Sequence, residues 1–111
     1  MKVLLATPPQ PASAILPRRY QAFSGPLKLL GGNRSILGIQ PPYGLMYLAA
    51  YLRQAGHEVS IVDGLRAAPD EVMTRIQRER PGVVGLSCVT WNWSEGRRLA
   101  QTIRAHHPDL T

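Results

Sequence analysis

The order of apolar and polar positions predicts three short strands that alternate with helices. Continuous apolar runs at residues 3–6 and 83–88 are typical of buried parallel strands, and the shorter run at 59–62 has the same character. Three segments have helical periodicity. One precedes the second run, one lies between the second and third runs, and one follows the third. This alternation indicates an α/β fold with a parallel sheet and helices on both of its faces.

The first helix is predicted directly after Pro41 and Pro42. Proline suits a helix entrance, where its missing N–H is not needed. Gly56 lies where the helix end requires a left-handed residue. Apolar residues between these limits recur with the spacing i, i+3, i+4 and i+7, which predicts one buried stripe. The stripe consists of Leu45, Leu48, Ala49 and Leu52.

Two further helices are predicted between and after the later strands. Pro69 begins the second, and Pro81 ends it. In the third, Asn92 is expected to cap the N-terminus, with Glu95 completing a capping box. The inward positions of the two helices are predicted to be Val72, Met73 and Ile76, then Leu99, Ala100 and Ile103.

These elements predict one domain, residues 1–111, with a flavodoxin-like (Rossmann-like) three-layer α/β sandwich. The sequence stops where a fourth strand is expected, so we interpret it as truncated before that strand. A long loop at about residues 8–41 follows the first strand and is rich in proline and glycine. It carries too many apolar residues for a disordered linker, so we expect it to pack on a ligand or a second domain.

Charge and composition restrict the function classes. The net charge is +6, but the arginines are scattered and not interleaved with aromatic residues, which argues against nucleic-acid binding. No apolar stretch is long enough to span a membrane. The single cysteine, Cys88, excludes an intrachain disulfide and agrees with a cytoplasmic location.

Ligands of open α/β sheets bind beyond the carboxyl ends of the strands, where the strand order reverses. With the flavodoxin-like order 2-1-3, the segments that meet there are residues 7–10 and 87–91. The prolines at 8 and 9 remove N–H donors that a phosphate-binding loop needs. Asp63 ends the second strand, where dinucleotide folds have a ribose-binding acid, but aspartate before glycine is also typical of a turn.

Few residues are candidates for chemistry. Cys88 fits a buried core thiol better than a nucleophile, and His57, His106 and His107 fit turn and helix-end positions better than metal ligands. We therefore predict no catalytic residue and no metal site. Trp91 and Trp93 leave two alternatives open. They could pack over a large flat cofactor, or one could cover the core while the other fills a domain interface.

Four segments of the chain together resemble one family. They are residues 2–9, 41–63, 80–87 and 107–109, and their order and spacing are similar to the N-terminal cobalamin-binding domain of cobalamin-dependent radical SAM proteins. That family includes the anaerobic magnesium-protoporphyrin monomethyl ester cyclase and many methyltransferases.

The resemblance implies a cobalamin site at the carboxyl edge. Ser87 and Val89 fall where related domains have a Ser-x-Leu element that lines the pocket of the nucleotide tail. The Asp-x-His-x-x-Gly motif that supplies a histidine to cobalt in other cobalamin domains is absent, so no axial histidine is expected. The implied cofactor-binding residues are Thr7, Pro8, Pro9, Ser87, Val89, Thr90 and Trp91.

The resemblance also implies a longer parent enzyme. A downstream radical SAM barrel would bind a [4Fe–4S] cluster and S-adenosyl-L-methionine and act on a small molecule by methyl transfer or ring formation. The present domain would bind cobalamin without catalysing a reaction. Two alternatives remain: an interaction domain of the same fold that has lost the cofactor, with the long loop as its partner surface, and a nucleotide- or flavin-binding enzyme. The missing phosphate loop weighs against the second.

Overall fold

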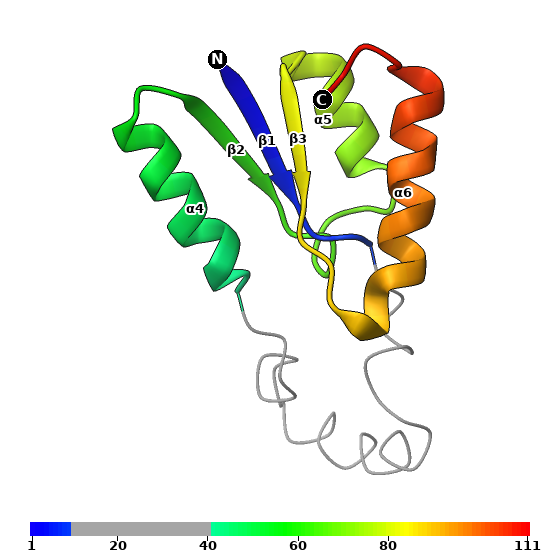
Figure 1. Cartoon of the computed structure of the whole chain (residues 1–111). Helices are drawn as coiled ribbons and strands as arrows, with labels where there is room; N and C mark the ends of the chain where they lie inside the picture. Colours follow the sequence, from blue (N-terminus) through cyan, green and yellow to red (C-terminus); the bar gives the residue numbers. More distant parts are fainter. Residues whose placement is uncertain (10–40) are drawn as a thin grey trace, which may run out of the picture.

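The computed structural model describes residues 1–9 and 41–111, and its strands form one parallel sheet (Figure 1). The strands are β1 (Lys2–Ala6), β2 (Glu58–Val62) and β3 (Val83–Leu86), in the order β2-β1-β3. The flavodoxin-like α/β class and the order 2-1-3 are thereby confirmed. The long loop predicted at residues 8–41 lies, apart from its ends, outside the described residues.

Strand β1 lies in the centre of the sheet and is the most buried strand. Every residue after Lys2 is buried, and Leu4 and Ala6 have no exposed surface. A central strand of a parallel sheet is covered on both faces, so both sets of alternating side chains must be apolar. This explains why the sequence shows a continuous apolar run here instead of an alternating pattern.

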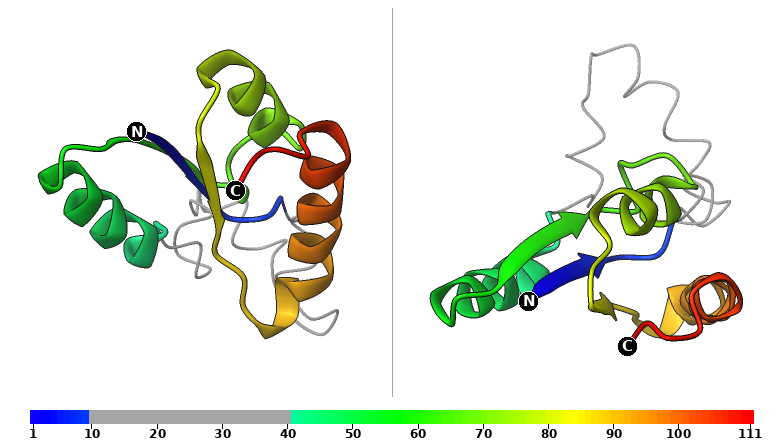
Figure 2. Two further views of the ribbon diagram at one scale, coloured as in Figure 1. Left: turned by 45° about the horizontal axis from the view of Figure 1, so that its top comes forward. Right: turned by 90° about the horizontal axis from the view of Figure 1, so that it is seen from above.

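The helices form two layers on opposite faces of the sheet (Figure 2). Helix α4 (Tyr43–Gln54) covers one face, and helices α5 (Glu71–Glu79) and α6 (Trp93–His106) cover the other. Each face has its own hydrophobic cluster of buried residues. On the α5/α6 face these are Leu4, Ala6, Val62, Val72, Ile76, Leu99 and Ile103. On the α4 face they are Val3, Leu5, Leu45, Ala49 and Val59.

Helix α4 buries a narrower stripe than the sequence predicts. Leu45 and Ala49 are buried and Leu52 is partly buried, but Leu48 is 47% exposed. The prediction for Leu48 was wrong because α4 lies mainly over β2, so only one narrow side of the helix meets the sheet. The predicted helix end is confirmed, since Gly56 has φ +86° and its N–H donates to the carbonyl of Arg53.

The later elements differ from the predicted ones mainly at their ends. Helix α5 begins at Glu71, two residues after Pro69, and β3 ends at Leu86, two residues before Cys88. A 3₁₀ helix, η2 (Thr90–Asn92), then leads into α6. Within α6, Leu99 and Ile103 are buried as predicted, but Ala100 is exposed, because it lies on the side of the helix turned away from the sheet.

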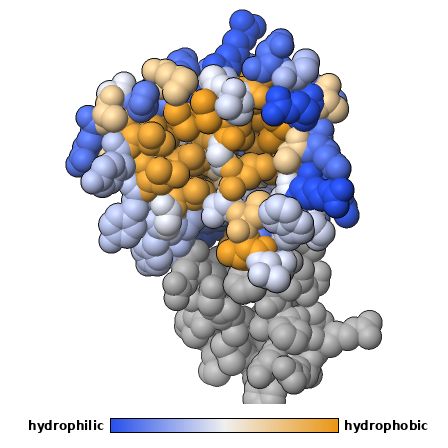
Figure 3. All heavy atoms as spheres, viewed as in Figure 1, coloured by the Kyte–Doolittle hydropathy of each residue, from blue (hydrophilic) through white to orange (hydrophobic). Residues whose placement is uncertain are grey.

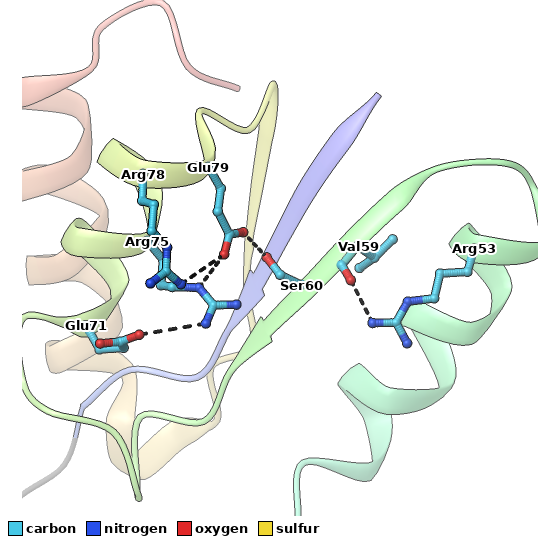
Figure 4. Close-up of polar contacts among 7 residues, drawn as sticks. All are labelled: Arg53, Val59, Ser60, Glu71, Arg75, Arg78 and Glu79. Atoms are coloured by element: carbon cyan, nitrogen blue, oxygen red, sulfur yellow. Dashed lines mark hydrogen bonds and ion pairs between the residues drawn. The ribbon is translucent and has the colours of Figure 1, made fainter.

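Polar side chains tie a helix to β2 on each face (Figure 4). On the α5/α6 face, Ser60 Oγ donates to Glu79 Oε2 over 2.6 Å, and this hydrogen bond lowers the pKa of Glu79 below its ordinary value. On the α4 face, Arg53 Nη2 donates to the carbonyl of Val59 over 2.6 Å. Both helices are thus held in register with the same strand.

Strand β3 is less covered than β1. All four of its residues are half-buried, although it pairs with β1 along its whole length. The main-chain N–H of Val84 donates to the carbonyl of Thr111 over 2.7 Å. Residues that follow α6 therefore return to the side of β3 that faces away from β1.

Candidate functional site

Three loops meet at the carboxyl edge of the sheet, because the three strands are parallel and end on the same side (Figure 1). Residues 7–9 follow β1, residues 63–70 follow β2, and residues 87–89 follow β3 before η2 begins. The strand order reverses between β1 and β3, so the first and third loops flank the switch point where α/β sheets bind ligands.

The loops after β1 and β2 are tied together through Thr7. Its hydroxyl accepts the main-chain N–H of Gly64 over 2.8 Å and donates to Asp63 Oδ1 over 3.4 Å. Asp63 Oδ1 also accepts the N–H of Leu65 over 3.1 Å, as expected for an aspartate that forms a turn. A Cβ at position 64 would lie 2.3 Å from the carbonyl oxygen of Thr7, so only glycine allows this close approach.

Pro8 is a buried residue of the site and lies between the loop after β1 and helix α6. Its side chain is less than 2% exposed. A Cβ at Gly96, in the first turn of α6, would lie 3.3 Å from Pro8 Cγ and 2.2 Å from Cys88 Sγ. Gly96 therefore lets α6 pack closely on the loops after β1 and β3, and it leaves Cys88 half-buried against the helix.

The loop after β3 carries the exposed side chains of the site. The N–H of Ser87 donates to the carbonyl of Ala6 over 2.9 Å and fixes the start of the loop to β1. Beyond it, Val89 is 47% exposed. An open hollow at this edge is lined by Cys88, Val89, Thr90 and Trp93.

The predicted capping role of Asn92 was wrong. Asn92 precedes α6, but its side chain makes no hydrogen bond to the first turn of that helix. Instead, Asn92 Oδ1 accepts the N–H of Val89 over 2.6 Å, which directs the side chain back into the loop. A capping pattern in the sequence does not reveal that the preceding 3₁₀ turn competes for the same acceptor.

The structure brings the predicted binding residues to one edge, with different exposure. Ser87, Val89 and Thr90 are exposed, Thr7 and Pro9 are half-buried, and Pro8 is buried. The side chain of Trp91 lies outside the described part of the chain, whereas Trp93 is 63% exposed beside the hollow. That these residues contact a cofactor stays a prediction.

Sequence reasoning missed the roles of Gly64 and Gly96. A glycine inside a helix costs stability relative to alanine, so Gly96 within a strongly periodic helix was a usable signal of close packing. Gly64 follows a strand-terminal aspartate and reads as an ordinary turn residue. Its contact with the loop after β1 depends on a sheet neighbour that is remote in sequence.

The histidines do not lie at this edge. His57 precedes β2, at the opposite end of the sheet, and His106 and His107 lie at the far end of α6. His106 Nδ1 is 2.9 Å from the carbonyl of Thr102. In residues 1–9 and 41–111 no group of three or more His, Cys, Asp or Glu side chains could hold a metal ion.

The B12 binding domain family model matches residues 30–111 of this chain. The chain belongs to the B12-binding domain family. It is also 30% identical over 82 residues to an anaerobic magnesium-protoporphyrin IX monomethyl ester cyclase from Rubrivivax gelatinosus. That match includes 71% of this chain and 15% of the cyclase, so the chain spans only a small part of its curated relative. No solved structure matches the chain significantly.

The B12-binding assignment agrees with the side chains at the carboxyl edge. Cobalamin has a broad corrin ring with amide side chains, and it needs both apolar contact and hydrogen-bonding groups. The edge offers exposed hydroxyls at Ser87 and Thr90 beside the apolar side chains of Val89 and Trp93. All three histidines of the chain, His57, His106 and His107, lie away from this edge. Among the described helices, none is long and apolar enough to cross a membrane.

Proposed function

We propose that this B12-binding domain holds cobalamin at its carboxyl edge and presents the corrin to a radical SAM barrel of a longer polypeptide. The observation that carries the proposal is the loop after β3. It displays Ser87, Val89 and Thr90 outward from a framework that is fixed by hydrogen bonds at both of its ends. A binding loop that is already ordered loses less conformational entropy when a ligand binds.

Four side chains at this edge have distinct proposed roles. The hydroxyls of Ser87 and Thr90 donate to or accept from the polar groups of the nucleotide tail and the corrin amides. Val89 gives apolar contact, and Pro9 forms a rigid rim on the loop after β1. The bound cofactor supplies a cobalt centre that carries a methyl group or exchanges electrons.

The radical SAM partner is proposed from the relative and from the sequence resemblance. The curated relative is a magnesium-protoporphyrin monomethyl ester cyclase, and this chain matches only 15% of it. We propose that the longer polypeptide binds a [4Fe–4S] cluster and S-adenosyl-L-methionine and acts on a small-molecule substrate by methyl transfer or ring formation. Iron and sulfide analysis of that polypeptide, together with reductive cleavage of S-adenosyl-L-methionine, tests this part separately.

Cobalamin binding is tested with hydroxocobalamin. After incubation and gel filtration, we expect the cobalamin absorption spectrum to elute with the protein. Thr90→Trp should weaken retention at least about tenfold, because a bulky ring would fill the hollow. Thr74→Trp, at an exposed threonine on α5, is the matched control and should retain cobalamin like the wild type.

Failure of the folded wild-type protein to retain hydroxocobalamin would refute the proposal. It would favour the second candidate, an interaction domain of the same fold that has lost the cofactor. One observation supports that candidate. Helix α4 exposes three tyrosines at successive turns, with Tyr43 54%, Tyr47 76% and Tyr51 77% exposed. Aromatic side chains are enriched at protein–protein interfaces, so this helix could bind a partner without any cofactor.

A further inference from the structure

Asn92 is a buried polar residue in a segment that is otherwise largely exposed. It is 7% exposed, whereas Val89 is 47% and Trp93 63% exposed. Burying an amide costs free energy unless the amide is hydrogen-bonded inside the protein. The hydrogen bond that the Asn92 side chain makes offsets this cost, and its partner shows which part of the loop Asn92 fixes.

Asn92 holds both main-chain polar groups of Val89. Its side-chain Oδ1 accepts the N–H of Val89 over 2.6 Å, and its own N–H donates to the carbonyl of Val89 over 3.1 Å. The two bonds close residues 89–92 into a ring. Because the polar groups of Val89 are directed into this ring, the side chains of Val89 and Thr90 remain on the outside, where they line the hollow.

A second anchor holds the other end of the same loop. The N–H of Ser87 donates to the carbonyl of Ala6, at the end of β1. Cys88, between the two anchors, packs against Gly96, where a Cβ would lie 2.2 Å from its sulfur. Two of these restraints need no polar side chain. The bond from Ser87 to Ala6 joins main-chain atoms, and the contact of Cys88 requires only that residue 96 is glycine. Asn92 provides the restraint that a side chain controls.

We infer that Asn92 is a positioning residue for the B12 site, which sets cofactor affinity by fixing Val89 and Thr90 without touching the cofactor. This inference rests on the proposed function, since it assigns the loop after β3 to cobalamin. Loss of the Oδ1 acceptor would leave the N–H of Val89 without its partner and release the ring. The loop would then have to become ordered when the cofactor binds, and affinity would fall.

Two variants separate the acceptor from the bulk of the side chain. Asn92→Leu keeps a similar volume and has no acceptor, and Asn92→Asp keeps an oxygen at the position of Oδ1. In hydroxocobalamin titrations followed by absorption, we expect Asn92→Leu to bind about tenfold or more weakly and Asn92→Asp to stay within about threefold of the wild type. Amide exchange of Val89, measured by NMR, should be fast in Asn92→Leu and slow in the other two proteins.

A destabilised control shows whether affinity follows the loop or general stability. Ile103→Val shortens a buried side chain of α6 that is far from the hollow. It should lower the melting temperature and leave hydroxocobalamin affinity unchanged. Equal binding by the wild type and Asn92→Leu would overturn the inference and leave the proposed function intact. Equal losses in Asn92→Leu and Asn92→Asp would also overturn it. A wild-type protein that binds no hydroxocobalamin would overturn both.

Discussion

The two faces of the sheet are packed to different degrees. On the α5/α6 face, two helices enclose a cluster of seven buried residues. On the α4 face, one helix lies mainly over β2 and forms with the sheet a cluster of five buried residues. Figure 3 shows apolar side chains gathered at the surface on the side seen in Figure 1, over the strands beside α4.

This difference indicates which face contributes more to the free energy of unfolding. Adjacent residues of β1 point to opposite faces, so the same strand supports both clusters. Side chains on the α5/α6 face are surrounded by protein, and a cavity made there cannot collapse easily. On the α4 face only one helix, α4, packs on the sheet, and it contacts β2 more than β1. We therefore expect equal truncations to cost more on the α5/α6 face.

Leu4 and Leu5 provide the most direct test, and the largest expected effect. Leu4 is 0% and Leu5 3% exposed, and they face the α5/α6 and α4 clusters respectively. We expect Leu4→Ala to lower the free energy of unfolding by about 4 kcal/mol and Leu5→Ala by about 2.5 kcal/mol. Urea denaturation measures both, and the m-values should agree if the unfolding remains two-state. Equal losses would show that the two faces are packed alike.

Helix α4 gives a second, smaller test within the less covered face. Leu45 is 7% exposed and Leu48, one turn later, is 47% exposed. Leu45→Ala should cost about 2 kcal/mol because it removes a buried side chain, and Leu48→Ala should cost less than about 0.5 kcal/mol. Thermal and urea unfolding of both variants check this. A large loss in Leu48→Ala would mean that Leu48 packs against another part of the protein in solution.

The test at Glu79 has the smallest expected effect. It concerns the pH dependence of the stability that the α5/α6 face provides. Its pKa is lowered below the ordinary value of a glutamate, chiefly by the hydrogen bond from Ser60, with Arg75 also contributing. A lowered pKa in the folded state stabilises the fold above the unfolded pKa, and this contribution is lost as pH falls through the lowered folded pKa. Glu79→Gln should therefore be less stable than the wild type at pH 7, by less than about 1 kcal/mol. The two proteins should become equal in strongly acidic solution.

Ser60→Ala serves as the companion variant for Glu79. It removes the largest cause of the lowered pKa and leaves the carboxylate in place. Urea unfolding between pH 2 and pH 7 should show a weaker acid dependence for Ser60→Ala than for the wild type. An unchanged pH profile in both variants would show that this ion-pair cluster does not contribute measurably to the stability of the α5/α6 face.

The sheet and its order could be predicted from the sequence because each element carries a local signal. Continuous apolar runs identified the strands, and Gly56 and Pro81 identified helix ends. Exposure was harder to predict. Leu48 and Ala100 have suitable helical spacing, but their exposure depends on how much of the sheet each helix covers. That property is set by the tertiary arrangement and not by the periodicity of one segment.

The location of the site could be predicted from the sequence, but the burial and hydrogen bonds of its residues could be predicted only in part. The strand order places residues 7–10 and 87–91 at one edge, and the structure agrees for the described residues among them. The sequence did not reveal that Pro8 is buried, or that Asn92 bonds to Val89 instead of capping α6. Both depend on close contacts around Gly96 and on competition between neighbouring hydrogen-bond donors, which a residue-by-residue pattern does not contain.

The central position of β1 has a consequence for synthesis. Of the three described strands β1 is translated before the other two, but Lys2 pairs with Glu58 and Val3 pairs with Val83. The nascent strand therefore has no neighbour until β2 leaves the ribosome, and its second edge stays open until β3 follows. Folding that depends on such remote pairings is slow, because the intervening chain must be closed into loops first. An apolar segment that waits in this way is a natural binding site for chaperones.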